Sequence, residues 1–437
     1  MTKPSNTTLH ATASPVYLAA GAVNNLIRGL PAGTAYFVGI TLVTMMSGQL
    51  VQHRGSLARA ALPFVAHLRW GWHRVHRAME RGTFSLDHLF DTLYAWCVDC
   101  LPVEPVRIGS KARAMHAIDT STIARLRAGK RLGWRGKGYC HRARRAVCAN
   151  IVAVCTAVVS VRGVRVGLVR RARLGENSEQ AVAQVFAAVP PAATARLFAV
   201  DAGIATTEQF ARASEQDALV GRLRVNVSLR RAPPARRACK RGRPRLHGAV
   251  LHPGARRVEG RPCETQVREV DGRRVRVRRW RGLHFARAPQ VVIDVVRVDS
   301  PHFKRPLVVG TMARELTSDE IRAASAQRWT VETNFYVAQG TCAMEMPRAW
   351  TPQATLRRIS LALLAGSLLK AIAAACEPLR MGPWDRRAVG SAGRLANHLD
   401  IHASNFAQLA LRGVTPRKYR ENEEANDAND LQLPKAA

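Results

Sequence analysis

From residue 112 to residue 228 the chain alternates strand-like and helix-like segments, and this order constrains the fold more than any other feature. A short apolar stretch, Ala112–Thr120, precedes two β-branched runs at 146–161 and 164–174, which predict a strand and then a hairpin. A helix at 178–189, a strand at 195–201, a helix at 207–216 and a strand at 221–229 follow. This order predicts a mixed α/β sheet with helices packed on it.

Two aspartates follow the predicted strands of this sheet. Asp119 ends the first apolar stretch, and Asp201 ends the strand LFAVD. In open α/β sheets, binding sites gather at the carboxyl ends of strands. We therefore expect Asp119 and Asp201 to lie together at the carboxyl ends of two strands.

A third carboxylate lies on a segment that predicts one helix over residues 317–340. Thr317 and Glu320 have capping-box spacing, and Gly340 is a plausible end. Ser325, Arg328, Glu332 and Gln339 are three, four and seven residues apart, so one face of that helix carries them. Trp329 and Phe335 flank the glutamate, and we expect Trp329 in the core. A surface Arg–Glu pair on an amphipathic helix is the alternative.

The charge of the chain indicates a polyanionic partner. It has 67 Lys and Arg against 31 Asp and Glu, a formal net charge of +36, and its hydrophobic content of 47% favours real cores over disorder. Nucleic acid is the leading partner. Residues 16–101 have helical periodicity and combine arginine, histidine and tryptophan, as in a module that docks on DNA or in an ordinary basic helical domain.

Residues 221–290 hold 21 basic and four acidic residues, a net charge of +17. The part Pro233–His247 predicts a mobile basic arm. In GRRVRVRRW, valine and arginine alternate with period two, which predicts a strand with one apolar and one cationic face. We expect Arg276 and Arg278 on the cationic face to contact a phosphate backbone. A solvated basic linker is the alternative.

Three carboxylates that meet repel one another unless cations neutralise them. Mg²⁺ and Mn²⁺ prefer oxygen ligands and keep positions open for a phosphate group. If Asp119, Asp201 and Glu332 converge, they predict phosphodiester chemistry with two metal ions.

These pieces resemble the DDE transposases of bacterial insertion sequences, whose catalytic core is ribonuclease-H-like. The matching motifs, IDTST, LFAVDAGIAT and QRWTVETNF, surround Asp119, Asp201 and Glu332. The last motif resembles a branch with a Tyr-x2-Arg-x3-Glu-x6-Lys helix and a β-rich insertion. Arg328 and Glu332 match, whereas Ser325 stands at the tyrosine position and Gln339 at the lysine position. The resemblance covers roughly residues 112–375.

The resemblance implies that Asp119, Asp201 and Glu332 hold two Mg²⁺ or Mn²⁺ ions. Water would attack first to free a 3′-OH at the element end, and that hydroxyl would then attack target DNA. Positions 325 and 339 contact DNA near the cleaved phosphate in the family. Arg328 would grip this phosphate or orient Glu332, with a structural ion pair as the alternative. A homodimer on double-stranded DNA is implied as well.

The expected organisation has five parts. They are an N-terminal helical DNA-binding region (1–111), the first part of the ribonuclease-H-like core (112–228), a basic β-rich insertion (229–305), the end of the core with the glutamate helix (306–375), and a C-terminal helical region with an acidic tail (376–437).

Two other functions compete with a transposase: a ribonuclease-H-like nuclease that does not join DNA, and a degenerate DNA-binding protein without catalysis. The nine cysteines and the absence of a signal-like N-terminus favour a reducing compartment. The resemblance implies a bacterial cytoplasmic protein that is nucleoid-associated when bound to DNA. No membrane partner is expected. Cys97 and Cys100 have no second pair at zinc-site spacing, so we expect free thiols on a helix.

Overall fold

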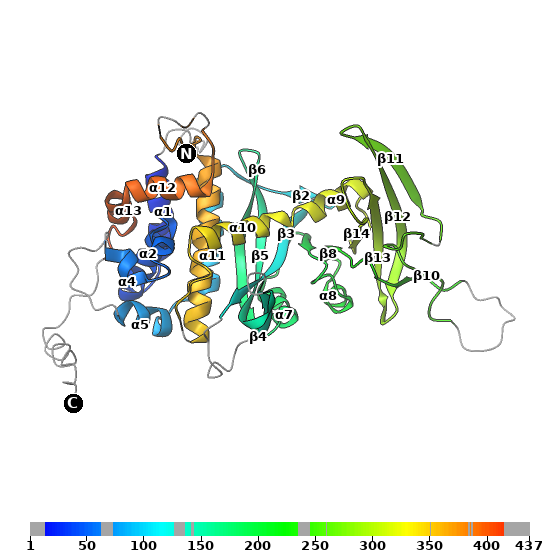
Figure 1. Cartoon of the computed structure of the whole chain (residues 1–437), viewed down its shortest axis with the longest axis horizontal. Helices are drawn as coiled ribbons and strands as arrows, with labels where there is room; N and C mark the ends of the chain where they lie inside the picture. The colour runs from blue at the N-terminus through cyan, green and yellow to red at the C-terminus, as the bar shows by residue number, and fades with distance from the viewer. Residues whose placement is uncertain are drawn as a thin grey trace, which may run out of the picture.

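A long mixed sheet runs through the molecule, with a helical bundle on one side (Figure 1). This computed structural model describes residues 14–62, 73–125, 136–140, 144–234, 245–258, 260–349, 351–382, 385 and 388–414. Parallel and antiparallel strands share the sheet, and helices cover it, so the α/β class is confirmed.

Five strands form the central part of the sheet, in the order β6, β5, β3, β7 and β8. Their bounds are β3 (Arg113–Ala124), β5 (Arg145–Val161), β6 (Val164–Gly175), β7 (Arg196–Val200) and β8 (Asp217–Arg222). Strand β5 is antiparallel to both of its neighbours, β3 and β6, whereas β7 is parallel to β3 and β8 is parallel to β7. The helices α7 (Ser178–Ala188) and α8 (Thr207–Arg212) lie between the strands in the chain, as predicted.

The predicted bounds of the strand at 221–229, which corresponds to β8, are wrong. The strand begins at Asp217 rather than residue 221 and ends at Arg222, and the preceding helix ends at Arg212. The apolar residues 218–220 are the ones buried in the sheet, whereas Arg224 is exposed. A hydrophobic run of only three residues gave too weak a periodic signal to separate it from the end of the helix.

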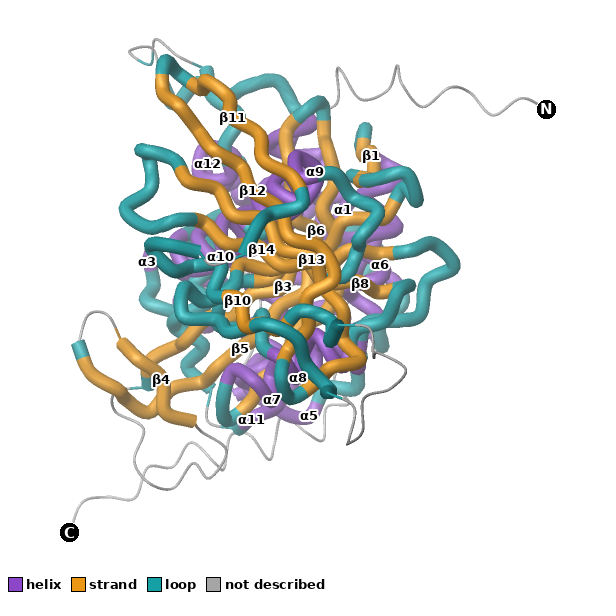
Figure 2. The backbone as a smooth tube through the Cα atoms, turned by 90° about the vertical axis from the view of Figure 1, so that its right-hand side faces the viewer, coloured by secondary structure: helices purple, strands orange, loops and turns teal. Residues whose placement is uncertain are grey.

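The insertion continues the same sheet beyond β8. Strand β14 (Leu307–Thr311) pairs with β8, β13 (Ala288–Asp299) with β14, and β12 (Arg273–Phe285) with β13, all antiparallel. The remaining strands of this part are β9 (Leu229–Arg230), β10 (Val250–Leu251) and β11 (Glu264–Val270). The hairpin of β11 and β12 projects from the molecule when it is viewed from this end (Figure 2).

Three short strands complete the sheet: β1 (Val103–Pro105), β2 (Arg107–Ile108) and β4 (Gly136–Cys140). They pair with β5, β3 and β5, respectively. Strand β4 lies within the glycine-rich basic segment for which no strand was expected.

The N-terminal region is helical, as predicted. It contains α1 (Pro15–Arg28), α2 (Ala32–Met46), α3 (Gln49–Gln52), α4 (Leu57–Ala61), α5 (His73–Arg81) and α6 (Leu86–Cys100). Cys97 and Cys100 lie on α6, and both are free thiols.

The helices from the two ends of the chain pack as one bundle (Figure 1). The C-terminal members are α11 (Pro352–Ala375), α12 (Ala392–Ile401) and α13 (Ala403–Ala410). The Nδ2 of Asn24 donates to the carbonyl oxygens of Ala410 (3.2 Å) and Arg412 (2.8 Å), and the Nε2 of Gln49 donates to Asp400 at 2.6 Å. The N-terminal helices therefore share their hydrophobic core with the C-terminal ones.

Helix α11 is the central helix of this bundle. In the described part of the chain it alone is long and apolar enough to cross a membrane by length and composition, and 89% of its most apolar window is buried inside the protein. Its apolar surface is therefore part of the protein core. Two buried arginines near its start, Arg357 and Arg358, donate to the backbone carbonyls of Met79 and Gly55.

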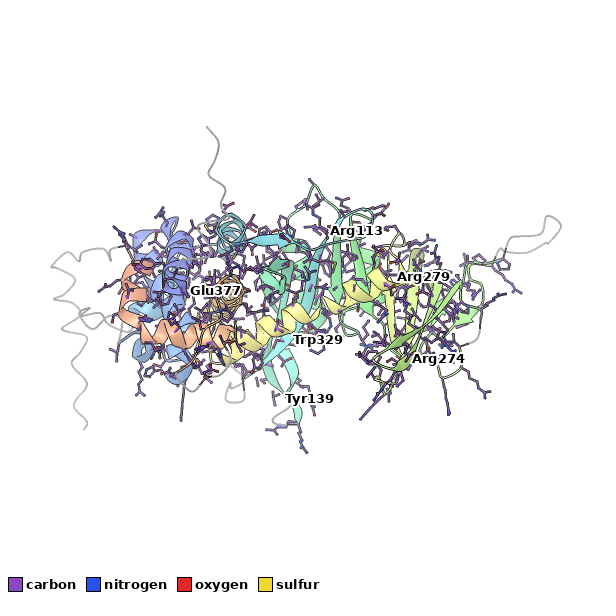
Figure 3. All side chains as sticks on the ribbon, turned by 90° about the horizontal axis from the view of Figure 1, so that it is seen from above. Arg113, Tyr139, Arg274, Arg279, Trp329 and Glu377 are labelled. Carbon is purple, nitrogen blue, oxygen red and sulfur yellow. The ribbon has the colours of Figure 1, made fainter. Side chains whose placement is uncertain are left out.

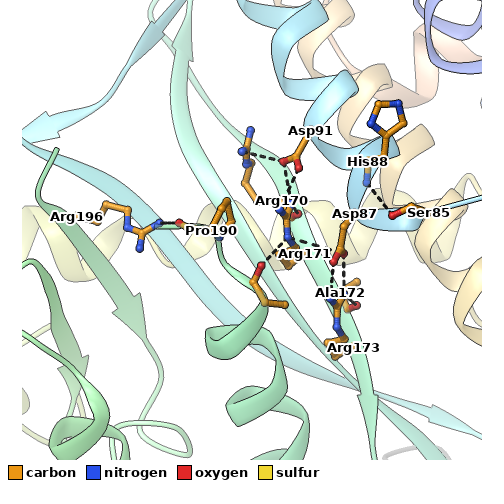
Figure 4. A network of polar contacts seen from close by, with 11 residues as sticks. Ser85, Asp87, His88, Asp91, Arg170, Arg171, Ala172, Arg173, Pro190 and Arg196 are labelled. Atoms are coloured by element: carbon orange, nitrogen blue, oxygen red, sulfur yellow. Dashed lines mark hydrogen bonds and ion pairs between the residues drawn. The ribbon is translucent and has the colours of Figure 1, made fainter. Parts of the chain in front are cut away.

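Ion pairs join the bundle to the sheet through α6 and β6 (Figure 4). The guanidinium of Arg171 donates to both carboxylate oxygens of Asp91, at 2.8 and 3.0 Å, and Arg173 forms the same forked contact with Asp87. Arg170 adds a second cation beside Asp91. Forked arginine–carboxylate pairs fix direction as well as distance, so α6 is held in one orientation on β6.

Candidate active site

Asp119 and Asp201 lie on neighbouring parallel strands. In the β3–β7 pairing, Ile118 is opposite Val200, so the two aspartates follow directly at the same level. Asp201 directly follows the last residue of β7, Val200, and so lies at the carboxyl end of its strand, as predicted. The prediction that Asp119 ends a strand is wrong, because β3 continues to Ala124 by pairing with β5 on its other side. Only the parallel pairing with β7 ends here, at Ile118, one residue before Asp119.

The prediction of one helix over 317–340 is also wrong. The capping box of Thr317 and Glu320 is present, but α9 (Ser318–Ala326) ends before α10 (Trp329–Gly340) begins. Through the junction, the amides of Gln327, Arg328 and Val331 donate to carbonyls three residues back. Such a tight turn in mid-helix commonly marks strain or a functional hinge.

Arg328 lies at this junction, and its guanidinium meets all three carboxylates. Its Nη1 donates to Asp119 Oδ2 at 2.8 Å and also to Glu332 Oε1. Its Nε lies 3.8 Å from Asp201 Oδ1. Two oxygens that accept hydrogen bonds from the same nitrogen, as those of Asp119 and Glu332 do, lie within about 6 Å of each other. The structure thus brings together three acids that are far apart in the sequence.

The burial of the three carboxylates differs. Asp119 is 14% exposed, Glu332 is 32% exposed and Asp201 is 40% exposed, so the acids line a site that is open on the Asp201 side. The Asp119 carboxylate also accepts from the backbone amide of Thr120 at 2.8 Å.

Burial raises the pKa of Asp119, and the neighbouring charges of Asp201 and Glu332 raise it further. The Thr120 amide and the Arg328 guanidinium oppose this shift without cancelling it. Burial lowers the pKa of Arg328, but its bond to Glu332 and the charges of all three acids outweigh burial, so its pKa is raised. Arg328 is therefore the resident counter-charge of this site.

The expectation that Trp329 lies in the core is wrong. The indole is 62% exposed, and Figure 3 shows it on α10. The guanidinium of Arg328 lies 5.3 Å from its ring centroid. Phe335, on another face of α10, is buried. The junction at Arg328 changes which residues face inward, because a tight turn rotates the chain differently from an α-helix.

Gln339 lies on the same side of α10 as the site. Its Nε2 donates to the hydroxyl of Ser121 at 3.1 Å, and Ser121 lies two residues beyond Asp119 on the same face of β3. Ser325 is half-buried in the last turn of α9, and its carbonyl oxygen accepts from the Arg328 amide.

The two arginines of the insertion that were predicted to contact DNA, Arg276 and Arg278, differ in exposure and in pairing. Arg276 is exposed on β12, and Val275 and Val277 beside it are buried, so the period-two pattern is correct there. Arg278 is half-buried and donates to Asp299 Oδ2 at 2.8 Å, which ties it to the fold. Figure 3 labels Arg274, the preceding exposed arginine of this strand face, on the outer part of the insertion.

Lys370 is a supporting residue that the sequence reasoning did not single out. From α11 its Nζ donates to the Thr330 carbonyl (3.3 Å), the Thr333 hydroxyl (2.5 Å) and Asn334 Oδ1 (2.7 Å), which flank Glu332 on α10. Burial lowers its pKa to about 7. The only signal in the sequence was a lone cation inside an otherwise apolar run.

A second supporting residue, Arg279, lies on β12. It pairs with Asp294 at 2.7 Å, and each of these side chains is only 1% exposed. The guanidinium also donates to the carbonyl oxygens of Arg314 and Leu316, in the segment that leads into α9. The insertion thereby positions the start of α9, the helix that precedes the one carrying Glu332. Figure 3 labels Arg279 beside this helix.

The donor set fits a hard divalent cation in its chemistry, because three carboxylates from two strands and a facing helix offer only oxygen ligands. In this structure the three carboxylates surround the Arg328 guanidinium instead. In the described ranges, no three acidic, histidine or cysteine side chains are close enough as they stand to hold one ion.

Several predicted features lie outside the described residues: most of the arm Pro233–His247, part of the N-terminal helical region (63–72), and the acidic tail. A scan of protein-family models finds none that matches this chain, and a search of curated proteins finds no match either.

Proposed function

We propose that this protein is a DDE transposase that cleaves and joins DNA at the ends of an insertion sequence. The observation that carries the proposal is the convergence of Asp119, Asp201 and Glu332 around one guanidinium. A structural ion pair needs one carboxylate, whereas this site assembles three from distant parts of the chain. Structural pairs are common, but a cluster of like charges is characteristic of catalytic sites.

The strand order supports a ribonuclease-H-like core. An antiparallel meander of β3, β5 and β6, followed by two strands parallel to β3 on its other edge, is the arrangement that such a core has. The three acids lie on the first strand, after the fourth strand and on a late helix, as the resemblance implies. The net charge of +36 supports a DNA substrate.

In this proposal, Asp119, Asp201 and Glu332 would hold two Mg²⁺ or Mn²⁺ ions, which supply activation of the attacking hydroxyl and stabilisation of the leaving oxygen. Asp119 is fixed in direction by the Thr120 amide. Arg328 offsets part of the negative charge of the three acids in the free protein. Its forked donors can turn to a DNA phosphate, a group that arginine binds in bidentate geometry.

The overall reaction is an in-line displacement at phosphorus. Water attacks the scissile phosphodiester and the bond from phosphorus to the 3′ oxygen breaks, which leaves a 5′-phosphate and a 3′-OH. That 3′-OH attacks a phosphodiester of target DNA, and the bond from this phosphorus to the target's own 3′ oxygen breaks in the second displacement. The protein would act as a homodimer on double-stranded DNA and work in the bacterial cytoplasm.

The test uses a supercoiled plasmid that carries the coding frame with a few hundred flanking base pairs, incubated with protein and Mg²⁺. We expect cleavage with a free 3′-OH and joined products. Asp119→Asn, Asp201→Asn and Glu332→Gln should each abolish both while DNA binding persists. Glu179→Gln, which alters an exposed acid of α7, is the matched control and should stay active.

Each alternative predicts a distinct result. Cleavage without joined products identifies a nuclease. If Asp119→Asn behaves like the unmodified protein in every assay, the proposal is overturned in favour of a binding protein without catalysis.

A further inference from the structure

Two adjoining cavities open beside the candidate active site. The larger has a volume of about 930 Å³ and the smaller about 310 Å³, and both are lined by Arg222 and Arg305. The larger one reaches Ala202, the residue after Asp201. We call the combined surface the basic groove. It lies where the end of β8, the segment after β10 and the segment before β14 meet.

The lining of the basic groove is strongly cationic. Arg224 and Arg256 line the larger cavity, Lys304 lines the smaller one, and Arg222 and Arg305 line both. All five side chains are exposed. Among the described residues, no carboxylate lines either cavity or forms an ion pair with any of the five. By contrast, several buried arginines of this protein are paired with carboxylates.

A buried network fixes one wall of the groove. Arg297 is buried and donates to the carbonyl oxygens of Pro253 (2.9 Å) and Ala255, which flank Gly254. Asp299 accepts from Arg297 and from Arg278. Burial by itself would raise the pKa of Asp299, but these two arginines lower it overall. Charge-assisted hydrogen bonds from Arg297 thus hold the loop that carries Arg256.

Gly254 allows this loop to approach the neighbouring chain segment. A Cβ at this position would lie 2.1 Å from the Val225 carbonyl oxygen, so no other residue fits without moving the backbone. Close backbone packing and the buried Arg297 together pre-organise the spacing of Arg224 and Arg256 across the cavity.

We propose that the basic groove binds the phosphodiester backbone of the DNA strand that leads away from the scissile phosphate. Five cations line the two adjoining cavities, and no described carboxylate lines either of them, which suits a ligand that carries several negative charges along its length. A single phosphate needs fewer cations. The groove begins next to Asp201, so a strand held there continues directly into the site. This inference rests on the proposed function.

The experiment compares two triple variants in the full-length protein. Arg224→Gln, Arg256→Gln and Arg305→Gln together remove three charges from the groove. Arg107→Gln, Arg165→Gln and Arg380→Gln together remove three exposed charges that line neither cavity and have no ion-pair partner among the described residues. Binding of a fluorescent DNA duplex is measured by anisotropy across a salt series, with circular dichroism as the check on folding.

For the groove variant we expect the slope of log affinity against log salt to flatten by about 0.9 for each DNA phosphate that the protein no longer neutralises. At ~0.15 M salt this corresponds to a decrease in affinity on the order of 100-fold. The control variant should keep the slope of the unmodified protein. Equal slopes in the two variants overturn the inference.

A competition arm separates the possible phosphate sources. If pyrophosphate displaces DNA from neither protein, a continuous backbone is the ligand, as inferred. If pyrophosphate binds the unmodified protein but not the groove variant while both bind DNA with the same slope, the groove takes free phosphate and the inference fails.

The experiment also distinguishes a failure of the groove inference from a failure of the proposed function. If the unmodified protein never cleaves but the slope of the groove variant flattens, the proposed function fails while the groove stands. If cleavage occurs and the groove variant keeps its slope, only the groove is overturned.

Discussion

Asp119 and Arg328 are 209 residues apart in the chain, and a 2.8 Å hydrogen bond joins the Oδ2 of the first to the Nη1 of the second. The same nitrogen donates to Glu332, so the strand acid and the helix acid share one proton donor. The guanidinium therefore occupies the position from which a cation compensates all three carboxylates. Its removal should expose their mutual repulsion.

The first prediction concerns Arg328→Gln. Without the guanidinium the three acids lack their counter-charge, so we expect the free energy of unfolding in EDTA to fall by about 1–3 kcal/mol. Added Mg²⁺ or Mn²⁺ should raise the melting temperature more in the variant than in the unmodified protein, because an ion that binds the folded state relieves the repulsion. Arg328→Lys is the control and should lie between the two. An unchanged melting temperature in EDTA would show that Arg328 does not compensate the acids.

The second prediction concerns Gln339→Lys. Gln339 is half-buried and bonds to Ser121 beside the site, so a longer cation there would face the substrate rather than the core. A charge-assisted bond is stronger than a neutral one, so binding to cleaved DNA ends should tighten by on the order of 1 kcal/mol, about fivefold. End-binding affinity and melting temperature are measured on the same variant. Lower stability without tighter binding would show that this face of α10 does not meet DNA.

The third prediction uses the lowered pKa of Lys370. In the unfolded chain a lysine keeps its proton to about pH 10.4, whereas burial lowers the folded pKa to about 7. Between these values the unfolded state binds more protons, so this lysine makes stability rise with pH, by up to about 1.4 kcal/mol per pH unit. Lys370→Met should remove this contribution.

Urea unfolding at pH 7 and at pH 9, for both proteins, measures that contribution as a difference. Other groups titrate in the same range, and the difference between the two proteins cancels them. Equal pH dependence in the two proteins would contradict the lowered pKa.

The fourth prediction concerns the buried pair of Arg279 and Asp294. Breaking such a pair leaves an uncompensated buried charge, so Asp294→Asn should destabilise the protein by roughly 3–5 kcal/mol. Arg279 also holds two carbonyl groups ahead of α9, so Arg279→Met should in addition weaken DNA cleavage. Replacing both residues by apolar ones of similar size should cost less than Asp294→Asn alone. A double replacement that costs as much as the sum of the two single ones would indicate that the pair is not coupled.

Sequence periodicity was sufficient for the order of the central elements. The long β-branched runs that became β5 and β6 are unambiguous, because each is longer than ten residues. Periodicity failed where the apolar run is short, as at β8. It also failed where a strand has different partners along its length, as at β3. Pairing with β5 keeps β3 extended after Asp119, and a single sequence carries no information about a partner strand.

For the candidate site, the identity of the three acids could be inferred from sequence, but their immediate environment could not. The junction between α9 and α10 has good helix formers on both sides, so nothing in Gln327 or Arg328 signals it. The exposure of Trp329 follows from that junction. The basic groove combines residues from β8, from the segment after β10 and from the segment before β14, and only the folded sheet brings these together.

The packing of α1 against α13 has a consequence for how this protein is made. Asn24 and Ala410, which hydrogen-bond, are 386 residues apart, and the apolar helix α2 is buried in the same cluster. A ribosome adding about 5–20 residues per second needs roughly 20–70 seconds to make α13 after α2 has emerged. During that interval α1 and α2 lack the C-terminal helices that cover part of their hydrophobic surface, so a chaperone or transient contacts within the nascent chain must cover that part.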